Sequence, residues 1–536
     1  MDRNFFLALA LAMLVAVGYQ SIFVVPQKAK ELKAAQLAAA KEDVTKETST
    51  KIDQSIQTIP AKISTNPSFK ETISVLKTPN IEAQFTNVGG ALHNIDFGPK
   101  KKSFLVEDIF TIKGFEQANY VLVNKTDSSL TYAFINSEIK ILKEYKIADS
   151  NSLKVKIEIT NRKSDSRLED VKIITLNVNG SSIDPKDNRN TMLDEISILE
   201  GKKVIRIGNA FKFNTKQNKV VAEQVGFVAF RDHYHAFIVK PEFDTKSYEN
   251  EMVSEKQLAT LITPKNQQLA AGTTSSYDFS VVVGNQDINW LKTYNKGIEK
   301  VVAFSGFWPI DFFAKAVYYT IPVLHSICRS WGLSIILISL LIYGITYPLT
   351  MKSMSSMRKM QLLQPKIAAL QAKYKKDPQK LNAEMIEIYK KEGVNPLGGC
   401  LPFLLQMPVF MALYQILWRA YYFQGESFLW MKDLALPDRL FHLPFEIPFL
   451  GSDFNILPIL MAIVMFVQQS ISSKNIVVTD EQQVMQQKMM KYIFPFFIGF
   501  IFYKFASGLS LYFTVFYALS AWTQWKVANT PAAKTK

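Results

Sequence analysis

Polar side chains that stand inside apolar segments are the first candidates for chemistry in this chain. Ser339, Tyr343 and Thr346 interrupt one such segment. Other apolar segments are interrupted by the following polar or helix-breaking residues: Pro402, Gln406 and Pro408; Gln468 and Gln469; Tyr512 and Thr514. A hydrogen bond between two helices explains an isolated residue of this kind. Their accumulation in several segments instead indicates a partly hydrated interior, because polar groups at that depth face protein or water.

Covalent catalysis is not expected from these residues. All five histidines lie outside the apolar segments: His93, His233, His235, His325 and His442. Those segments contain no metal-ligand set and no paired carboxylates, which excludes an intramembrane aspartyl protease or a proton-driven antiporter. The two cysteines, Cys328 and Cys400, form no CxxC motif, so neither a disulfide framework nor a cysteine zinc site is expected. We therefore expect no enzyme activity, no cofactor and no metal.

The elements that must position these residues begin with an apolar run near the N-terminus. Phe5–Val25 predicts a transmembrane anchor within residues 1–27. A cleaved signal peptide is the alternative, but its apolar core is about 7–15 residues long and ends at small residues. This run is longer and continues into Val24-Val25-Pro26-Gln27. Residues 28–70 are rich in Lys, Glu, Ala, Thr and Ser, which predicts a flexible linker.

Residues 71–300 contain short apolar runs separated by Asn, Asp and Gly. Leu153–Ile159 alternates apolar and polar residues, as half-buried strands do. Further strands are predicted at these runs: Ile81–Val88, Tyr120–Val123, Val171–Val178 and Ser280–Val283. Many short strands with turn residues between them predict an all-β sandwich of about 220 residues. The region contains no glycine-rich phosphate loop.

The remaining apolar segments predict a helical membrane region. The aromatic segment at 301–332 is interrupted by Asp311, Lys315 and His325, which favours an amphipathic helix lying in the membrane interface. Residues 333–350 predict transmembrane helix 2, and residues 395–525 predict transmembrane helices 3–6 with their connecting loops. With the anchor, this makes six transmembrane helices. Residues 526–536 form a short basic tail.

The net charge of +15 is distributed as the positive-inside rule expects, and not as a nucleic-acid surface. Residues 351–394 carry ten Lys or Arg and four acids, whereas residues 421–455 carry two Lys or Arg and five acids. The first loop is therefore predicted to be cytoplasmic and the second external. Both termini are then cytoplasmic, and the β domain is external.

Residues 351–394 predict a helical hairpin. Its first arm carries an apolar seam at spacings of three and four, typical of packed helices: Met360, Leu363, Ile367, Leu370 and Tyr374. Asp377-Pro378 predicts the N-cap and first turn of the second arm, whose apolar stripe is Leu381, Met385 and Tyr389. Two interpretations remain open. The hairpin is either a solvated linker or a docking surface for partners or lipid headgroups, in which the exposed cations would be Lys366, Lys373, Lys375, Lys376 and Lys380.

Five short motifs in order resemble one known family. They are Tyr347-Pro348-Leu349-Thr350, Leu363-Gln364-Pro365-Lys366, Asn395-Pro396-Leu397-Gly398-Gly399-Cys400-Leu401-Pro402, Gln406-Met407-Pro408 and Ser507-Gly508-Leu509. Together they resemble the YidC family of membrane-protein insertases, in the Gram-negative form with a large periplasmic domain. The match is dense over residues 300–525, and elsewhere it rests on the order of the segments.

The resemblance implies a fold and a way of working. The fold would be a five-helix core with a hydrophilic groove open to the cytoplasm and to lipid, plus a periplasmic β-supersandwich. The protein would insert and chaperone nascent membrane proteins in the inner membrane, alone or with the Sec translocon, and would be approached by the ribosome and targeting factors. It would not bind nucleic acid directly. Carried over by position, the residues of the groove would be Ser339, Tyr343, Thr346, Gln406, Met407, Pro408, Tyr512 and Phe513.

One position departs from the family pattern. Relatives usually carry an arginine in the groove where this chain has Tyr343. A buried cation attracts acidic substrate tails, whereas tyrosine offers only a hydroxyl group. Arg419 and Lys504, the nearest cations in other segments, stand toward the outer ends, where long basic side chains reach the interface.

Two other classes of function remain as alternatives. A transporter or channel would need inverted repeats or a closed polar pore, and the sequence shows neither. Alternatively, the external β domain is the working part, as an envelope scaffold that binds a partner or a sugar, although a fold alone does not fix a function.

Overall fold

The computed structural model describes residues 70–529, except for 99–101, 105, 164–170, 180–193, 209–214, 266–268, 295–296, 303, 305–307, 375–376, 395–400, 448–449 and 474–480. The predicted anchor at 1–27, the linker up to residue 69 and the end of the tail lie outside the described residues. So do Lys375, Lys376 and Cys400.

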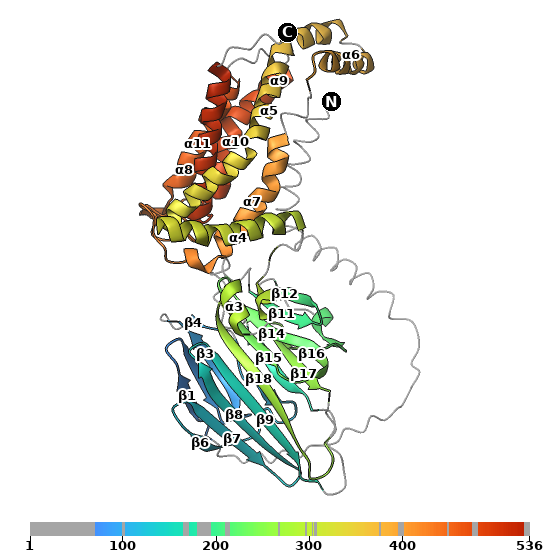
Figure 1. The fold of residues 1–536 in the computed structure, drawn as a ribbon, viewed down its shortest axis with the longest axis vertical. Coiled ribbons are helices and arrows are strands. Elements are labelled where there is room, and N and C mark those ends of the chain that lie inside the picture. Colours follow the sequence, from blue (N-terminus) through green and yellow to red (C-terminus); the bar gives the residue numbers. More distant parts are fainter. Residues whose placement is uncertain are drawn as a thin grey trace, which may run out of the picture. The chain divides into compact units, whose positions relative to one another are not determined.

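The β-rich part, residues 70–285, consists of three antiparallel sheets (Figure 1). The nine-stranded sheet has the order β12 (Lys203–Gly208), β11 (Glu195–Glu200), β14 (Val225–Arg231), β15 (His235–Pro241), β18 (Thr274–Asn285), β9 (Ser152–Asn161), β8 (Ile139–Asp149), β7 (Ser129–Ile135) and β6 (Val121–Lys125). The five-stranded sheet has the order β13 (Lys219–Val221), β16 (Thr245–Ser254), β17 (Gln257–Pro264), β10 (Ile173–Asn179) and β5 (Thr111–Ile112). The four-stranded sheet joins β1 (Ile73–Lys77), β2 (Ile81–Thr86), β3 (Ala91–Phe97) and β4 (Lys102–Ser103).

One apolar core lies between these sheets. It draws buried side chains from each of them, such as Phe85 of β2, Ile173 of β10 and Tyr145 of β8. Alternation along the strands explains this, because every second residue of β9 is buried from Leu153 to Ile159. All five predicted strands are present, and the secondary structure of the predicted sandwich is confirmed.

A lysine is buried in this core. Lys143 of β8 is 0% exposed, and its Nζ donates to the carbonyl oxygens of Gly89 and Phe110. The same nitrogen lies 4.6 Å from the ring centre of Tyr120. Gly89 must be glycine, because its φ is +65° and a Cβ there would lie 2.6 Å from the carbonyl oxygen of Glu116. Lys143 thus ties the turn between β2 and β3 to a neighbouring loop.

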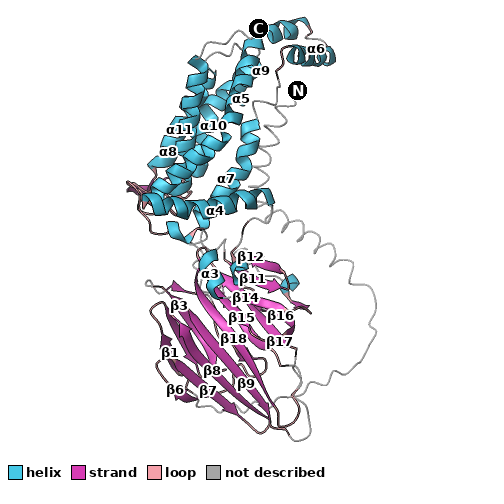
Figure 2. Cartoon of the chain, in the orientation of Figure 1, coloured by secondary structure: helices cyan, strands magenta, loops and turns pink. Residues whose placement is uncertain are grey.

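The helical part runs from residue 308 to residue 529 (Figure 2). Its helices are α4 (Trp308–Cys328), α5 (Trp331–Lys373), α6 (Pro378–Lys391), α7 (Leu401–Arg419), α8 (Ile456–Ser473), α9 (Glu481–Lys488), α10 (Phe494–Phe502) and α11 (Ser507–Asn529). A π-helical turn, Met489–Ile493, joins α9 to α10, and a 3-10 turn at Tyr421–Phe423 follows α7. A small hairpin of β19 (Phe441–Ile447) and β20 (Gly451–Phe454) precedes α8. Between the β-rich and helical parts are α3 (Ile288–Tyr294) and a 3-10 turn (Ile298–Val301). A further 3-10 turn, Thr215–Gln217, lies within the β-rich part.

Within the helical part, α4 runs crosswise to the long axes of α5, α8 and α11 (Figure 1). One of its faces packs on the other helices through Ala314, Val317 and Ile321. Its other face exposes large apolar side chains: Trp308, Phe312, Tyr319, Val323 and Ile327. The helix α4 is thus amphipathic, and its position in the membrane interface stays a prediction.

The six predicted transmembrane helices are not confirmed as a set. Among the described residues, one helical stretch, Trp331–Ser356, is long and apolar enough to cross a bilayer. Three shorter apolar stretches are Gln406–Leu417, Ile456–Ser472 and Met489–Phe502. The helix α11 has 23 residues, but its Ser, Thr and Gln residues lower its hydropathy.

The predicted boundary between transmembrane helix 2 and the cytoplasmic hairpin is not a break in the chain's structure. The helix α5 continues for 43 residues through Pro348 and Pro365. Leu363 and Ile367 of α5 pack with Val394, and four residues surround them: Met360, Met385, Ile388 and Tyr389. The predicted N-cap of α6 is confirmed, because the Asp377 side chain accepts a hydrogen bond from the Lys380 backbone N–H at 3.1 Å.

Candidate functional site

Three of the predicted polar residues satisfy their hydroxyl groups within their own helix. Ser339 Oγ donates to the carbonyl oxygen of Ile335 at 2.6 Å, and Thr346 Oγ1 donates to that of Ile342 at 3.0 Å. Thr514 of α11 does the same toward Ser510 at 2.7 Å. Back-bonding of this kind hides a hydroxyl group in an apolar helix. These three side chains therefore need no water.

Tyr343 forms a different kind of contact, which links two helices. Its side chain is 6% exposed, and its hydroxyl group donates to Oγ1 of Thr523 at 2.5 Å. The ring lies edge-on to Phe516 of the same partner helix, with centroids 5.6 Å apart. The position at which the family resemblance implies a cation thus holds a neutral hydrogen bond between α5 and α11.

Two more hydrogen bonds connect α11 to other helices. Gln406 of α7 donates to the Tyr512 hydroxyl group at 3.2 Å, and Gln468 of α8 donates to Ser520 Oγ at 2.8 Å. α11 therefore supplies one polar partner to each of α5, α7 and α8. We call these three pairs the polar seam: Tyr343–Thr523, Gln406–Tyr512 and Gln468–Ser520.

Buried oxygen atoms without partners accompany the polar seam. Among the described residues, the Gln524 side-chain oxygen and Ser510 Oγ of α11 lack a hydrogen-bond partner, as does the Gln415 side-chain oxygen of α7. Buried polar atoms are nearly always paired with protein or with ordered water. These three atoms therefore indicate positions for water, or for polar groups of a bound chain, along α11 and α7.

The structure places the other predicted groove residues on α7 and α11. Gln406, Met407 and Pro408 of α7 are partly exposed. Phe513 of α11 is 4% exposed and packs against Phe502 with centroids 5.1 Å apart. Ser339, Tyr343 and Tyr512 are buried in contact with neighbouring helices.

On the α11 side of the polar seam, sequence reasoning found Tyr512 but missed Thr523 and Ser520. Thr523 and Gln524 lie just beyond the apolar run that ends near Trp522, so the polarity that marks them was attributed to the end of a span. Ser520 stands within the last apolar run but was not singled out there, unlike Ser339 in an earlier run. The signal that would have found them is the helical spacing of Ser520, Thr523 and Gln524, which places them close together on α11.

The loop at 421–455, predicted above to be external, covers the N-terminal ends of α8 and α11; we call this contact the outer closure. Asp438 is 2% exposed, and its Oδ2 accepts hydrogen bonds from the backbone N–H groups of Ile456 at 3.0 Å and Leu457 at 2.9 Å. The N–H of Gly508 donates to the carbonyl oxygen of Leu434 at 2.9 Å. These contacts satisfy N–H groups that a helix leaves unpaired in its first turn. The same loop thereby covers this end of both helices.

The predicted hairpin cations have different surroundings. Lys366 pairs with Glu392 at 2.6 Å, which holds α5 against the end of α6. Lys373 and Lys380 lie over the ring of Tyr374, at 5.1 Å and 5.6 Å from its centre. An exposed ion pair contributes little to stability.

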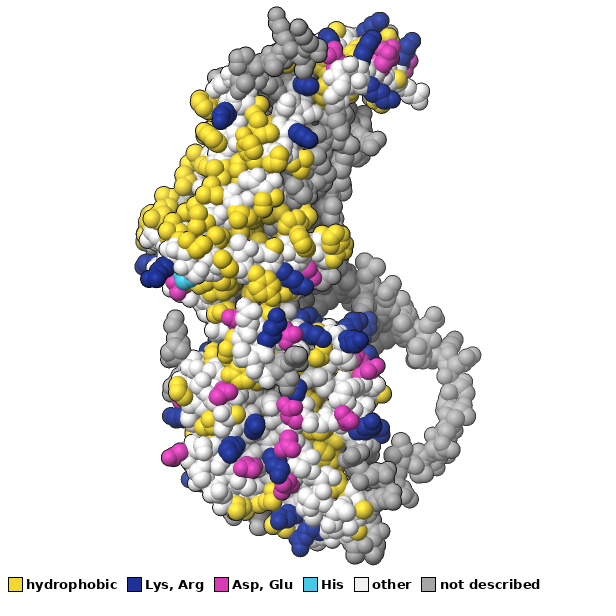
Figure 3. Space-filling view, viewed as in Figure 1, with side chains coloured by type: hydrophobic (Ala, Val, Ile, Leu, Met, Phe, Trp, Pro, Cys, Tyr) yellow, Lys and Arg dark blue, Asp and Glu magenta, His cyan; other side chains and the backbone are white. Residues whose placement is uncertain are grey.

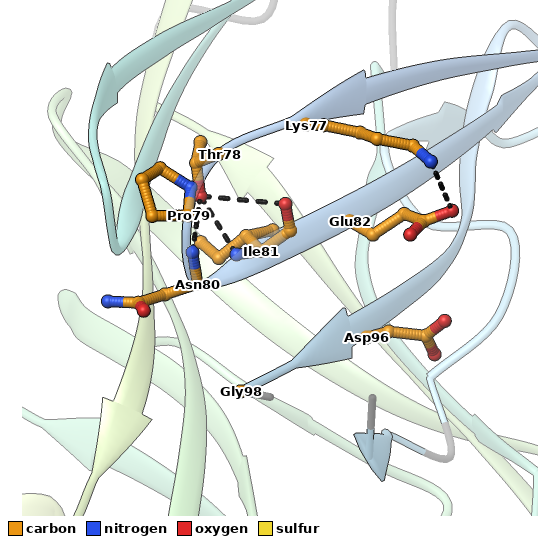
Figure 4. Close-up of a pocket in the computed structure, with 8 residues that line it drawn as sticks. All are labelled: Lys77, Thr78, Pro79, Asn80, Ile81, Glu82, Asp96 and Gly98. Carbon is orange, nitrogen blue, oxygen red and sulfur yellow. Dashed lines mark hydrogen bonds and ion pairs between the residues drawn. The ribbon is translucent and has the colours of Figure 1, made fainter. Parts of the chain in front are cut away.

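Two polar features of the described β-rich residues stabilise the structure of the β-rich part itself. A surface pocket lies at the turn between β1 and β2, where Thr78 Oγ1 accepts from the backbone N–H of Ile81 at 2.8 Å and Lys77 pairs with Glu82 at 3.2 Å (Figure 4). The polar groups of this pocket thus stabilise the turn between β1 and β2.

The second feature is a buried ion pair. Arg231 binds both carboxylate oxygens of Glu195, at 2.9 Å and 3.0 Å. Burial raises the pKa of Glu195, but the hydrogen bonds and charges of Arg231 and Arg206 outweigh burial and lower it to about 2. A carboxylate held this way links β11 to β14 and is not available as a proton donor near neutral pH.

Comparison with known proteins matches both the helical and the β-rich part of the chain to family models. Residues 323–534 match the family model of the 60Kd inner membrane protein, and residues 109–319 match that of the YidC periplasmic domain. The second match covers most of the β-rich part and extends into α4, and the first covers the rest of the helical part. The chain belongs to the YidC family. It is thus an inner membrane protein with a β-rich periplasmic domain and a helical C-terminal region.

Relatives carry the same family name. The chain is 36% identical over 332 residues to the membrane protein insertase YidC of Chlorobium limicola, which covers 60% of this chain and 55% of the relative. It is 39% identical over 261 residues to that of Chloroherpeton thalassium, covering 48% and 43%. The chain thus spans about half the length of the curated relatives it matches. A crystal structure of an active YidC insertase with its first transmembrane domain resolved is 20% identical, with 85% and 93% coverage and a TM-score of 0.36.

Proposed function

We propose that this YidC-family chain is a membrane protein insertase and folding chaperone. Its substrates would be nascent integral membrane proteins of the inner membrane, inserted by the chain alone or with the Sec translocon. The observation that carries the proposal is the polar seam of α11 with unpartnered buried oxygens beside it. The insertase names of the curated relatives support the same function.

The polar seam supplies the physical step. A polar segment of a nascent chain must cross the hydrocarbon layer, where each unsatisfied backbone group costs several kcal/mol. The three seam pairs are neutral hydrogen bonds, and a substrate's own polar groups can replace them one for one. Separation of α11 from α5 and α7 would then open a hydrated groove toward lipid. The apolar part of the substrate partitions into the bilayer alongside, so no covalent step is required.

The helix lengths add a second contribution. The apolar stretches at Gln406–Leu417, Ile456–Ser472 and Met489–Phe502 are shorter than the roughly 20 residues that span a bilayer. Short spans thin the bilayer locally, and each ångström of mismatch costs only a fraction of a kcal/mol. A thinner bilayer beside the groove shortens the path of the polar segment. The six-helix arrangement with both termini in the cytoplasm is part of this proposal.

The hairpin of α5 and α6 would meet the substrate first. Because α5 is continuous from Trp331 to Lys373, the hairpin's first arm is an extension of the helix that carries Tyr343. The exposed cations Lys373 and Lys380 would dock the incoming chain, a targeting factor or the ribosome, or rest on lipid headgroups.

The test is insertion into proteoliposomes that contain the purified full-length chain. We expect a small single-span protein to become protected from protease, and Tyr343→Arg to preserve or increase protection of substrates with acidic tails. Crosslinks from Tyr343 and Met407 to a stalled nascent chain should accompany insertion. In cells, depletion should leave small membrane proteins uninserted; unchanged insertion after depletion would reject the proposal.

A further inference from the structure

The hairpin of β19 and β20 stands apart from every other described sheet. It is a two-stranded sheet that no third strand joins. Isolated two-stranded hairpins are only marginally stable in water, so an ordered one needs a surface to rest on. We call this element, residues 441–454, the outer hairpin. It belongs to the loop that is predicted to be external, and it leads into the start of α8.

The sequence of β19 gives the outer hairpin two different faces. Residues 441, 443, 445 and 447 are Phe, Leu, Phe and Ile, whereas 442, 444 and 446 are His, Pro and Glu. Since successive side chains of a strand point to opposite sides, the alternation predicts one apolar face and one mixed polar face, although the pairing with β20 shifts register between His442 and Ile447. Phe445 is 60% exposed and Phe441 is 48% exposed. Leu443 and Ile447 are partly buried, so Phe441 and Phe445 are the apolar side chains that the protein itself leaves uncovered on this strand.

The polar side is organised by contacts of its own. His442 Nδ1 lies 2.7 Å from Asp453 Oδ1, and the Arg439 guanidinium lies 3.1 Å from His442 Nε2. Glu446 is exposed on the same strand. These charged groups suit water or the headgroup layer, where Arg439 would also attract phosphate.

The outer hairpin is continuous with the exposed apolar surface of α8. It leads directly into α8, whose exposed apolar side chains recur at helical spacing: Ile456, Ile459, Leu460, Ile463 and Val467. Leu436 and Leu440, just before the hairpin, are 52% and 42% exposed. Hydrophobic side chains cover much of the visible helical part, whereas charged side chains are scattered over the β-rich part (Figure 3). In an inner membrane protein, an apolar strip of this kind at the end of a span meets the bilayer.

We propose that the outer hairpin is a membrane anchor that lies in the leaflet at the outer ends of the helices. Phe441 and Phe445 enter the acyl-chain boundary, and His442, Asp453 and Glu446 stay among headgroups and water. Together with α4, it would hold the outer rim of the helical part at a fixed depth. The inference needs only the membrane location of the chain, and it stands whether or not the chain inserts other proteins.

The test uses the full-length protein in vesicles of phosphatidylethanolamine and phosphatidylglycerol. Cys328→Ser and Cys400→Ser provide a cysteine-free background, into which Phe445→Cys, Phe441→Cys or the control Glu446→Cys is placed. Each is labelled with an environment-sensitive nitrobenzoxadiazole probe. All three parent side chains are exposed, so the substitutions remove little of the packed core.

We expect the probes at 445 and 441 to show blue-shifted emission and strong quenching by a nitroxide placed high on the acyl chain. The probe at 446 should be quenched by aqueous iodide instead. Equal iodide quenching at 445 and 446 would overturn the proposal. If the probe at 445 is shielded in native membranes but exposed in pure lipid vesicles, a protein partner occupies this face and the lipid assignment is wrong.

Discussion

At the scale of single residues, the contact between Tyr343 and Thr523 carries the strongest prediction. Hydrogen bonds between helices in a membrane contribute about 0.6–2 kcal/mol. We expect Tyr343→Phe and Thr523→Val each to destabilise the helical part by about 1 kcal/mol. The double variant should cost little more than either single variant, because both remove the same bond. Unfolding of the purified protein in mixed detergent micelles measures these changes, and strictly additive losses would show that the bond contributes nothing.

Lys143 makes a second prediction at this scale, concerning pH. Burial lowers the pKa of its ammonium group from 10.5 to about 7. Between these values the unfolded chain binds a proton that the folded chain does not. The free energy of unfolding should therefore rise as pH increases from 7 toward 10, by up to about 1.4 kcal/mol per pH unit. Urea titrations read by brief proteolysis of the β-rich part would follow this rise.

The control for that prediction is Lys143→Met, which keeps the length of the side chain and removes the titrating group. Its titrations should lack the additional slope above pH 7. If the wild-type and Lys143→Met proteins responded equally to pH, the ammonium group would have to keep its proton while buried, held by the carbonyl groups of Gly89 and Phe110.

Residues of the candidate site show where sequence reasoning stops. Polar residues within apolar runs were visible as interruptions, and Tyr343, Gln406 and Tyr512 all proved to bond across helices. Ser339 looked the same in the sequence but bonds within its own helix. Whether such a side chain bonds to a neighbouring helix depends on how its own helix is rotated about its axis, because the rotation decides which residues face the neighbour. Local sequence does not determine that rotation. For the same reason the partners Thr523 and Ser520 could not be assigned.

At the scale of elements, the strands were predictable and the helix ends were less so. Strict alternation in β9 fixed both its type and its buried face. In α5, a sharp rise in polarity predicted a boundary near residue 350, yet the helix continues through Pro348 and Pro365 to Lys373. Proline bends a helix without ending it when the flanking residues favour the helix. A rise in the number of polar residues indicates where a helix leaves the membrane. The helix itself can continue beyond that position.

Close packing at the outer end of α11 supplies the prediction for this scale. A Cβ on Gly508 would lie 3.0 Å from Cδ1 of Ile335 and 3.1 Å from the carbonyl oxygen of Leu434. Gly508→Ala should therefore push α11 away from the loop that closes its end and cost about 1–3 kcal/mol. A Cβ on Gly344 of α5 would meet no atom of another residue within 4 Å, so Gly344→Ala is the matched control.

We expect Gly344→Ala to be neutral or to stabilise α5 by up to about 1 kcal/mol, because alanine favours the helix. Thermal unfolding in detergent, followed by size-exclusion chromatography of the surviving protein, would compare the two. Equal unfolding midpoints for Gly508→Ala and Gly344→Ala would mean that the outer closure accommodates an additional methyl group without strain.

At the scale of the whole molecule, the chain combines an ordinary β core with a helical part that exposes apolar side chains outward and keeps polar bonds inside. The 421–455 loop is bonded to the N-terminal end of α11 and covers it, so the two ends of this helix differ, although Ser510 and Gln524 near either end each carry an unpartnered buried oxygen. This asymmetry predicts that water enters from one side only. It distinguishes a one-sided groove from a channel, which would be wet along its whole length.

That asymmetry is testable with single cysteines in a Cys328→Ser, Cys400→Ser background. Gln524→Cys and Thr346→Cys should react with a water-soluble maleimide added from the cytoplasmic side of inverted membrane vesicles. Leu340→Cys, which replaces an exposed apolar side chain of α5, should not react, because a thiol that faces lipid cannot form the reactive thiolate. Ser510→Cys, next to the outer closure, should react slowly from either side. Fast reaction at 510 from the outside would indicate a continuous pore, and no reaction at 524 would mean that the interior is dry and the polar seam purely structural.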